Sequence, residues 1–146
     1  MKELRSRVGL VFQYPEHQLF ETEIFKDVCF GPKNLGLSHK EVEIRAFESL
    51  RLVGIDDNMF YQSPFDLSGG QKRRVAIAGV LAMKPDVLIL DEPTRNFSPL
   101  SGPVIRKMLR EFPGAVISIS HDRKYIEEVC DKIYQLNPNG LQLIGD

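Results

Sequence analysis

The chain has 146 residues, of which 42% are hydrophobic and 27% are charged, and its formal net charge is −1. This length and composition are typical of one globular domain with a sizeable core. The balanced charge gives no basic field, so we expect no nucleic-acid partner. No apolar run reaches the ~20 residues of a membrane span. The two cysteines, Cys29 and Cys130, lack metal-ligand spacing and indicate reduced core thiols.

The N-terminal part of the sequence begins with a strand pattern and then becomes helical. Val8–Phe12 is a short apolar run typical of a buried strand, and Gln13 stands where it ends. Apolar side chains then recur at helical spacing from Ile24 onward. We expect Gly31-Pro32 to bend or end this first helix.

Two further helices are predicted, each with its own start or stop signals. Ser38 opens one of them as the first residue of a capping box with Glu41, and Gly54 closes it. The next is expected from Gln71 to Met83, where Lys84-Pro85 ends it. The inward faces are predicted to be Val42, Ala46, Leu50 and Val53 in the first of the two, and Val75, Ala78, Leu81 and Ala82 in the second.

The C-terminal part alternates strand and helix patterns. Val87–Leu90 is continuously apolar, which predicts a central parallel strand covered on both faces. Pro103 fits the first turn of a helix, Ala115–Ser120 reads as a strand, and Asp122 is a candidate cap for the helix that carries Ile126 and Val129. A closing hairpin is expected over residues 133–144. The alternation predicts an α/β fold with a parallel sheet.

Two acidic residues follow the strand in the run VLILDEPT, residues 87–94. The carboxyl edge of a parallel sheet is where α/β proteins bind ligands. Asp91 is therefore a candidate for holding Mg²⁺ through a bound water, and Glu92 for orienting or deprotonating an attacking water. The alternative is an ordinary acidic turn in which Asp91 caps a helix.

The run LSGGQ at residues 67–71 has the features of an anion-binding loop. Gly69 and Gly70 let the backbone approach a phosphate, Ser68 adds a hydroxyl donor, and a helix starting near Gln71 directs free N–H groups outward. The alternative is that Ser68 and Gln71 form only an S-x-x-Q capping box. Capping leaves the two glycines unexplained, since each costs ~1 kcal/mol inside a helix.

Two polar residues gain significance from their positions at strand ends. Gln13 and His121 each follow an apolar strand directly, so we expect both at the same sheet edge as Asp91. Gln13 is a candidate for coordinating Mg²⁺ or sensing a γ-phosphate, and His121 for contacting that phosphate or the attacking water. Taken singly, each is more often an ordinary strand-end residue. The basic residues 72–74 are expected to form a solvated face.

The order Gln13, LSGGQ, VLILDEPT and His121 resembles the latter two-thirds of the ATP-binding domain of ABC proteins. The first 94 residues look especially similar to the ATPase subunits of energy-coupling-factor vitamin importers and of cobalt/nickel importers, whereas residues 114–136 resemble the soluble F subfamily. The resemblance implies a partial P-loop NTPase core with a parallel sheet. Residues 1–146 would form a single incomplete ABC domain, with a helical subdomain over about 21–83 and an α/β core over 7–13 and 84–146.

The resemblance also implies a role for each motif. Gln13 would belong to the Q-loop and Asp91 to the Walker B strand. Both would contact the Mg²⁺ ion. Glu92 and His121 would be the catalytic residues. The signature residues would contact ATP held by another subunit; these are Ser68, Gly69, Gly70 and Gln71. The implied cofactors are ATP and Mg²⁺. The implied partners are a second ABC ATPase subunit and a transmembrane subunit, which would place the chain at the cytoplasmic face of the cell membrane.

Two departures from the family pattern bear on activity. No G-x-x-x-x-G-K-[ST] phosphate loop, the Walker A motif, occurs in the 146 residues, and Ser98 stands where the family's D-loop has an aspartate. We therefore expect the chain alone to be inactive as an ATPase and to leave core faces uncovered. Three alternatives remain open: a non-enzymatic module that completes a partner's ATP site, a soluble F-type protein, and an ordinary α/β protein with chance motifs.

Overall fold

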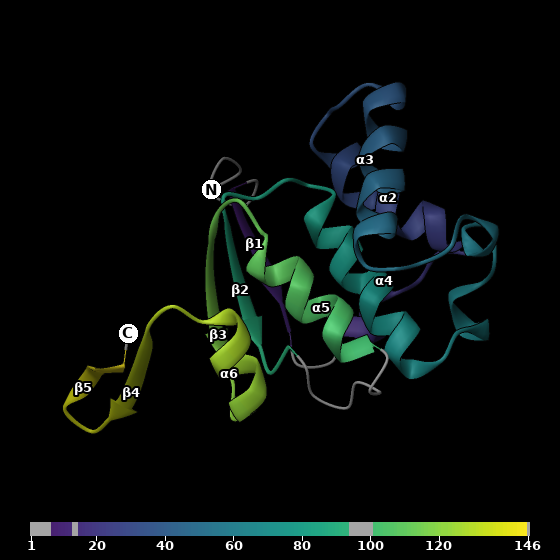
Figure 1. Cartoon of the computed structure of the whole chain (residues 1–146). Coiled ribbons are helices and arrows are strands. Elements are labelled where there is room, and N and C mark those ends of the chain that lie inside the picture. Colours follow the sequence, from purple (N-terminus) through teal and green to yellow (C-terminus); the bar gives the residue numbers. More distant parts are fainter. Residues whose placement is uncertain (1–6, 13–14, 94–100, 146) are drawn as a thin grey trace.

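The computed structural model describes residues 7–12, 15–93 and 101–145. Within these ranges the chain forms a three-stranded sheet with helices on one side, a helical arm, and a C-terminal hairpin (Figure 1). The mixed α/β fold expected from the sequence is confirmed. No helix of the described part of the chain is long and apolar enough to cross a membrane.

The sheet is parallel, and its central strand comes from the middle of the chain. Strand β2 (Val87–Asp91) lies between β1 (Val8–Val11) and β3 (Ala115–Ile119). Both pairings are parallel, with Val87 opposite Val8 on one side and opposite Ala115 on the other. All three carboxyl ends therefore lie at one edge, where Asp91 stands opposite Ile119.

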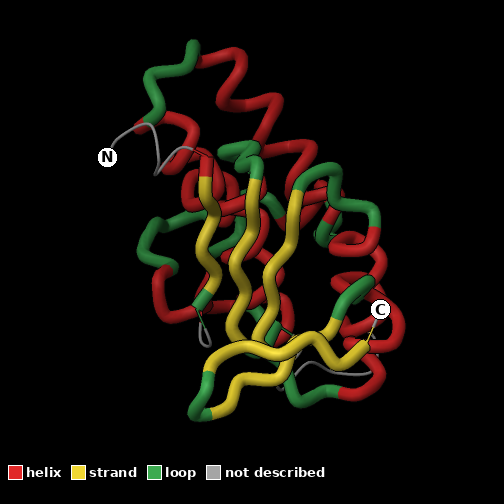
Figure 2. The backbone as a smooth tube through the Cα atoms, turned by 90° about the vertical axis from the view of Figure 1, so that its left-hand side faces the viewer, coloured by secondary structure: helices red, strands yellow, loops and turns green. Residues whose placement is uncertain are grey.

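The helices next to the sheet all cover the same face of it. Helices α4 (Gly69–Leu81), α5 (Ser101–Arg110) and α6 (Arg123–Val129) lie on that side, and Figure 2 looks onto the opposite face, where the strands are in front. Leu88 and Leu90 of β2 point to the helices and are fully buried. Ile89 points the other way and is only half-buried. The expectation that β2 is covered on both faces was therefore wrong for the described residues.

The arm consists of α2 (Ile24–Asn34) and α3 (His39–Leu52), with short 3₁₀ turns η1 (Pro15–Gln18), η2 (Asp57–Met59) and η3 (Pro64–Asp66). Both helices pack on each other and on α4. The inward faces predicted for the second and third helices are buried as expected. Helix α2, however, does not end at Gly31-Pro32 but continues to Asn34, with Pro32 buried inside it.

The cap residues predicted from the sequence fix the helix starts. The Ser38 hydroxyl accepts from the backbone N–H of Glu41, and Asp122 caps α6 by accepting from two backbone N–H groups. The main inward side chain of α6 was not foreseen, because it is Tyr125, which is fully buried, whereas Ile126 is half-buried. Its hydroxyl shares a hydrogen bond with Ser118, and burial raises the pKa of Tyr125 to about 12.

The expected hairpin is confirmed as strands β4 (Ile133–Asn137) and β5 (Gly140–Gly145), which form a separate two-stranded sheet. Gly140 adopts a φ of 117°, which a residue with a Cβ rarely reaches, so a glycine is required in this turn. Several large apolar side chains of the hairpin are exposed: Tyr134, Leu136, Leu141, Leu143 and Ile144.

The uncovered sheet face yields a prediction about the 146-residue chain. Ile117 and Ile119 are 56% and 57% exposed on it. We expect the folded chain to bind the dye ANS, and the double change Ile117→Thr with Ile119→Thr to reduce that fluorescence with little change in thermal stability, because threonine keeps strand propensity.

Leu88→Thr is the matched control, since Leu88 is buried against the helices. That change should cost about 3 kcal/mol of unfolding free energy through a lost core contact and a buried hydroxyl. Equal loss of stability for both changes would show that the face is not open.

Candidate functional site

Three of the predicted site residues meet at the carboxyl edge of the sheet. Asp91 is the last residue of β2, Glu92 follows it, and His121 comes shortly after β3. The backbone N–H of Glu92 donates to the carbonyl oxygen of Ile119 at 2.7 Å, which extends the pairing of the two strands by one residue. The parallel register therefore brings together residues nearly 30 positions apart in the chain.

Glu92 and His121 face each other at this edge. The distance between Glu92 Oε1 and His121 Nε2 is 3.7 Å. The Glu92 side chain is 18% exposed, whereas His121 is 93% exposed. The pair thus joins a sheltered carboxylate to an imidazole that faces solvent, an arrangement open to a ligand from outside.

The backbone of Glu92 is strained. Its φ is 49°, in the left-handed region that a residue with a Cβ enters at a cost of about 1 kcal/mol. Strain of this kind persists only where the surroundings hold it, here by the hydrogen bond to Ile119. The conformation turns the chain sharply after β2 and leaves the carboxylate within reach of His121.

The donor chemistry at this edge suits a magnesium ion that keeps most of its own ligands. No group of three or more His, Cys, Asp or Glu side chains is placed to hold a metal within the described ranges. Mg²⁺ is usually bound by one or two carboxylates, with water and phosphate oxygens completing its shell. Asp91, the predicted magnesium ligand, supplies one such carboxylate at the end of β2. Gln13, the other predicted magnesium ligand, lies outside the described residues.

The predicted signature residues stand at the start of α4, which begins at Gly69, two residues earlier than expected. Both hydrogen bonds of the capping box are formed: Gln71 N–H donates to Ser68 Oγ at 3.2 Å, and Ser68 N–H donates to Gln71 Oε1 at 3.0 Å. Capping and anion binding are compatible, because Ser68 Oγ accepts from Gln71 and keeps its own O–H to donate.

The two glycines occupy the first turn of α4, where backbone N–H groups have no partner within the helix. A Cβ added at Gly69 would meet nothing within 4 Å. Internal packing therefore does not explain why this position lacks a side chain. Close approach of an external group to the backbone does explain it.

The strand-end residues and the signature residues form separate groups. Within the described part of the chain, no hydrogen bond or ion pair joins Ser68–Gln71 to Asp91, Glu92 or His121. The first turn of α4 and the carboxyl end of β2 nevertheless lie toward the same end of the molecule (Figure 1).

The basic residues after the signature are not the solvated face that the sequence suggested. Arg73 is 3% exposed, and its Nε lies 3.3 Å from Glu16 Oε2 of η1. Arg74 donates to the carbonyl oxygens of Val53 and Gly54, and burial lowers the pKa of its guanidinium. Arg73 thus ties the signature helix to the turn that follows the predicted Q-loop. The sequence pattern did not predict the burial of Arg73, because adjacent arginines usually face solvent.

Comparison with known proteins decides the family. The model of the family described as ABC transporter matches residues 1–95. The chain belongs to the ABC transporter family. The matched residues include the capped glycine loop and the strand-end carboxylates described above.

Among curated proteins this ABC domain is similar to the energy-coupling factor transporter ATP-binding protein EcfA2 of several bacteria. It is 50% identical to that of Caldanaerobacter subterraneus over 99% of the chain, and 48% identical to that of Clostridium acetobutylicum over 100%. These alignments cover 52% and 53% of the relatives, so the chain spans about half their length. They run through the C-terminal residues that resemble the F subfamily as well.

Solved structures give the same assignment. CbiO1 from Clostridium perfringens, part of the ABC transporter complex CbiONQ, superposes with a TM-score of 0.85 at 38% identity, over 99% of this chain and 59% of that one. A dimeric ATP-binding cassette in a post-hydrolysis state, bound to ADP and phosphate, gives a TM-score of 0.76 at 28% identity, over 91% and 61%.

The buried Arg73–Glu16 pair generates a stability prediction. Arg73→Met leaves the Glu16 carboxylate largely buried beside an apolar side chain, and we expect a loss of about 3 kcal/mol in the free energy of unfolding, measured with urea. Adding Glu16→Gln should restore part of that loss, because the uncompensated charge is then removed.

Lys72→Met is the matched control for Arg73→Met. Lys72 lies one residue earlier on the same helix, with its ammonium 5.9 Å from the Phe65 ring, and we expect a change below about 1 kcal/mol. Equal effects at the two positions would refute a specific role for the buried pair.

Proposed function

We propose that this chain is part of the ATP-binding subunit of an energy-coupling-factor type ABC transporter, in which Mg-ATP binding and hydrolysis drive membrane transport. The observation that carries the proposal is the pairing of Glu92 with His121 beside Asp91 at the carboxyl edge of the sheet. The similarity to EcfA2 over almost the whole chain supports the same transporter class.

Each residue at the sheet edge has a proposed task. Glu92 accepts the proton of the attacking water at its carboxylate, which is sheltered yet open toward His121. His121 contacts the γ-phosphate or that water from its exposed position. Asp91 holds Mg²⁺, which neutralises charge on the phosphates when bound. Gln13 is proposed as a further magnesium contact, on the strength of the family resemblance alone.

The signature residues are proposed to act on ATP held by a second ATPase subunit. The free N–H groups of the first turn of α4, the Ser68 hydroxyl and the positive end of the helix dipole all favour a phosphate. Their separation from Glu92 within one chain fits a site that two subunits complete. A dimeric cassette with ADP and phosphate among the similar structures supports this arrangement.

The proposed location is the cytoplasmic face of the cell membrane, reached through a transmembrane partner subunit. The solved relative CbiO1 is described as part of a transporter complex, which supports this placement by analogy. The transported substrate is then selected by other subunits.

A second proposed function is a non-enzymatic module that lends its signature loop to a partner. It is favoured by one observation: the signature loop is formed and exposed at the start of α4, and no hydrogen bond or ion pair among the described residues ties it to Glu92 or His121. The two functions differ in whether Glu92 contributes to turnover.

One pair of variants separates the two functions in the assembled transporter. Glu92→Gln removes the base, so we expect ATP hydrolysis to fall at least about 100-fold while ATP binding persists. Ser68→Asp keeps the helix cap but places a negative charge against a phosphate, so it should abolish turnover with little loss of stability.

Turnover and nucleotide affinity measured on purified complexes check both expectations, with the exposed surface change Glu111→Gln as the control. Loss of turnover in both variants supports an ATPase subunit. Loss with Ser68→Asp alone supports the non-enzymatic module. Full turnover in both would refute both functions.

A further inference from the structure

The uncovered face of the sheet is an apolar surface that carries almost no charge. The strand register places Leu10, Ile89 and Ile117 directly opposite one another across the three strands. Leu10 is 47% exposed and Ile117 is 56% exposed. Five further residues point to the same side of their strands: Val8, Val87, Asp91, Ala115 and Ile119. Among these residues only Asp91 is charged, and it stands at the carboxyl end of β2.

The hairpin adds a second apolar surface on the same side of the molecule. Four exposed apolar side chains share one of its faces, in two cross-strand pairs: Tyr134 with Leu143 and Leu136 with Leu141. The pair between them, Gln135 with Gln142, points to the other face. Figure 2 shows the hairpin in front of the uncovered sheet face, near the carboxyl ends of the strands, and in Figure 1 it lies on the side away from α4 and α5.

The accessible surface of the chain shows that this side is large enough for a stable interface. The chain has a mass of 16.6 kDa and exposes 9187 Å². A compact monomer of that mass exposes about 7,600 Å². The difference of about 1,600 Å² is roughly twice the surface that each partner loses in an interface of standard size.

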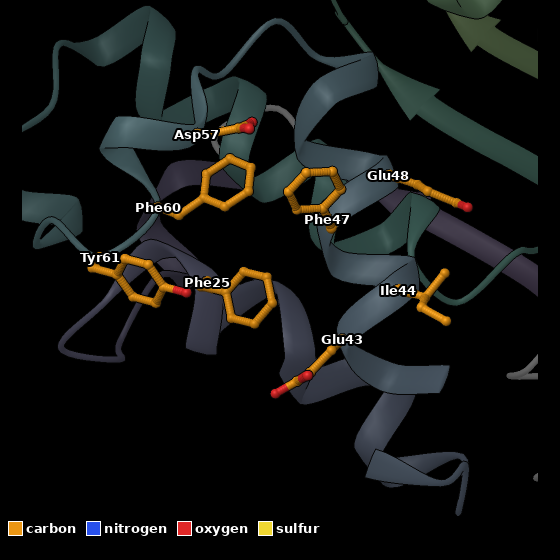
Figure 3. Close-up of a pocket in the computed structure, with 8 residues that line it drawn as sticks. All are labelled: Phe25, Glu43, Ile44, Phe47, Glu48, Asp57, Phe60 and Tyr61. Carbon is orange, nitrogen blue, oxygen red and sulfur yellow. The ribbon is translucent and has the colours of Figure 1, made fainter. Parts of the chain in front are cut away.

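The other exposed apolar region of note, an aromatic groove on the helical arm, has a different character. Its volume is about 470 Å³ (Figure 3). Four rings line it: Phe25, Phe47, Phe60 and Tyr61. The charged residues that line it are all acidic: Glu43, Glu48 and Asp57. Two copies of the chain that met at their grooves would therefore bring like charges together, which is unfavourable.

The sheet side, in contrast, is complementary to itself. It is apolar on both the sheet and the hairpin, and its one carboxylate lies at the margin. The formal net charge of −1 also gives little repulsion between whole chains. A second copy of this chain therefore fits this side without an unpaired charge at the centre of the contact.

We propose that two copies of this chain associate through the uncovered sheet face and the apolar side of the hairpin, about a two-fold axis. The two sheets pack face to face, with the rows of Leu10, Ile89 and Ile117 at the centre. The strands of the two copies run in opposite directions, because the same direction would place both Asp91 carboxylates and both hairpins at one end. Each hairpin then lies beside the amino ends of the other copy's strands.

This pairing differs from the ATP-dependent one proposed above. The signature residues Ser68–Gln71 stand at the start of α4, which lies on the opposite side of the sheet. We therefore expect the chain to self-associate without nucleotide. Ser68→Asp should leave that self-association unchanged, although it should abolish turnover in the assembled transporter.

Sedimentation velocity of the 146-residue chain over a range of concentrations, without nucleotide, tests the proposal. The sedimenting mass should rise from 16.6 kDa to twice that value and then stop rising, because a two-fold interface is closed. ANS fluorescence per chain should fall over the same range of concentration, because the second copy covers the sheet face.

Two double variants locate the interface. Ile117→Thr with Ile119→Thr removes apolar surface from the sheet face, and Leu136→Gln with Leu141→Gln removes it from the hairpin. Each should weaken self-association at least about tenfold. The hairpin variant protects the test against misfolding, since its two side chains are 77% and 71% exposed.

Leu52→Gln with Phe65→Gln is the matched control. These side chains are 57% and 72% exposed, and both lie outside the sheet and the hairpin. The control removes a comparable amount of exposed apolar surface, so it should leave self-association unchanged. Circular dichroism verifies that every variant remains folded.

The mass of a single chain at every concentration would overturn the proposal and would assign the sheet side to a different polypeptide. Growth beyond two chains would overturn the closed two-fold pairing. Equal weakening by the control variant would show that the contact is not specific to this side. A requirement for ATP, or loss of the dimer in Ser68→Asp, would assign the dimer to the signature residues and would also overturn the proposal.

Discussion

The parallel pairing of β2 with β1 on one side and β3 on the other is the constraint on which the candidate site depends. Leu88 and Leu90 fix the central strand by complete burial against the helices. With the strand held in register, its end and the end of β3 must emerge side by side. The backbone bond from Glu92 to Ile119 then bends the chain through a left-handed residue, and the carboxylate comes within reach of His121.

Helix α4 carries out a second structural task by linking the sheet to the arm. It contacts β1, α2, α3 and η1, so its orientation is set from several directions. The buried ion pair between Arg73 of α4 and Glu16 of η1 lies where these two elements meet. The Arg73–Glu16 pair thus links the first turns of α4 to η1.

The two sides of α3 give the arm two different surfaces. One side of α3 is an ordinary apolar stripe that completes the core with Val42, Ala46 and Leu50. The other side keeps aromatic rings and carboxylates in contact with solvent. Keeping such rings exposed costs hydrophobic free energy in the isolated chain.

The sequence by itself determined the family, the order of strands and helices and the capped helix starts, because these depend on local periodicity, turn chemistry and short motifs. From the same short motifs it predicted Asp91, Glu92, His121 and the signature loop as site residues. The sequence did not predict that one face of β2 is left uncovered, that α2 continues through Pro32, or that α4 begins at Gly69. It also did not predict the burial of Tyr125 and Arg73. Those features, like the Glu92–His121 contact and the aromatic groove, were decided by tertiary structure. Each depends on contacts between residues far apart in the chain, and a local sequence pattern does not specify which distant side chains a residue will contact.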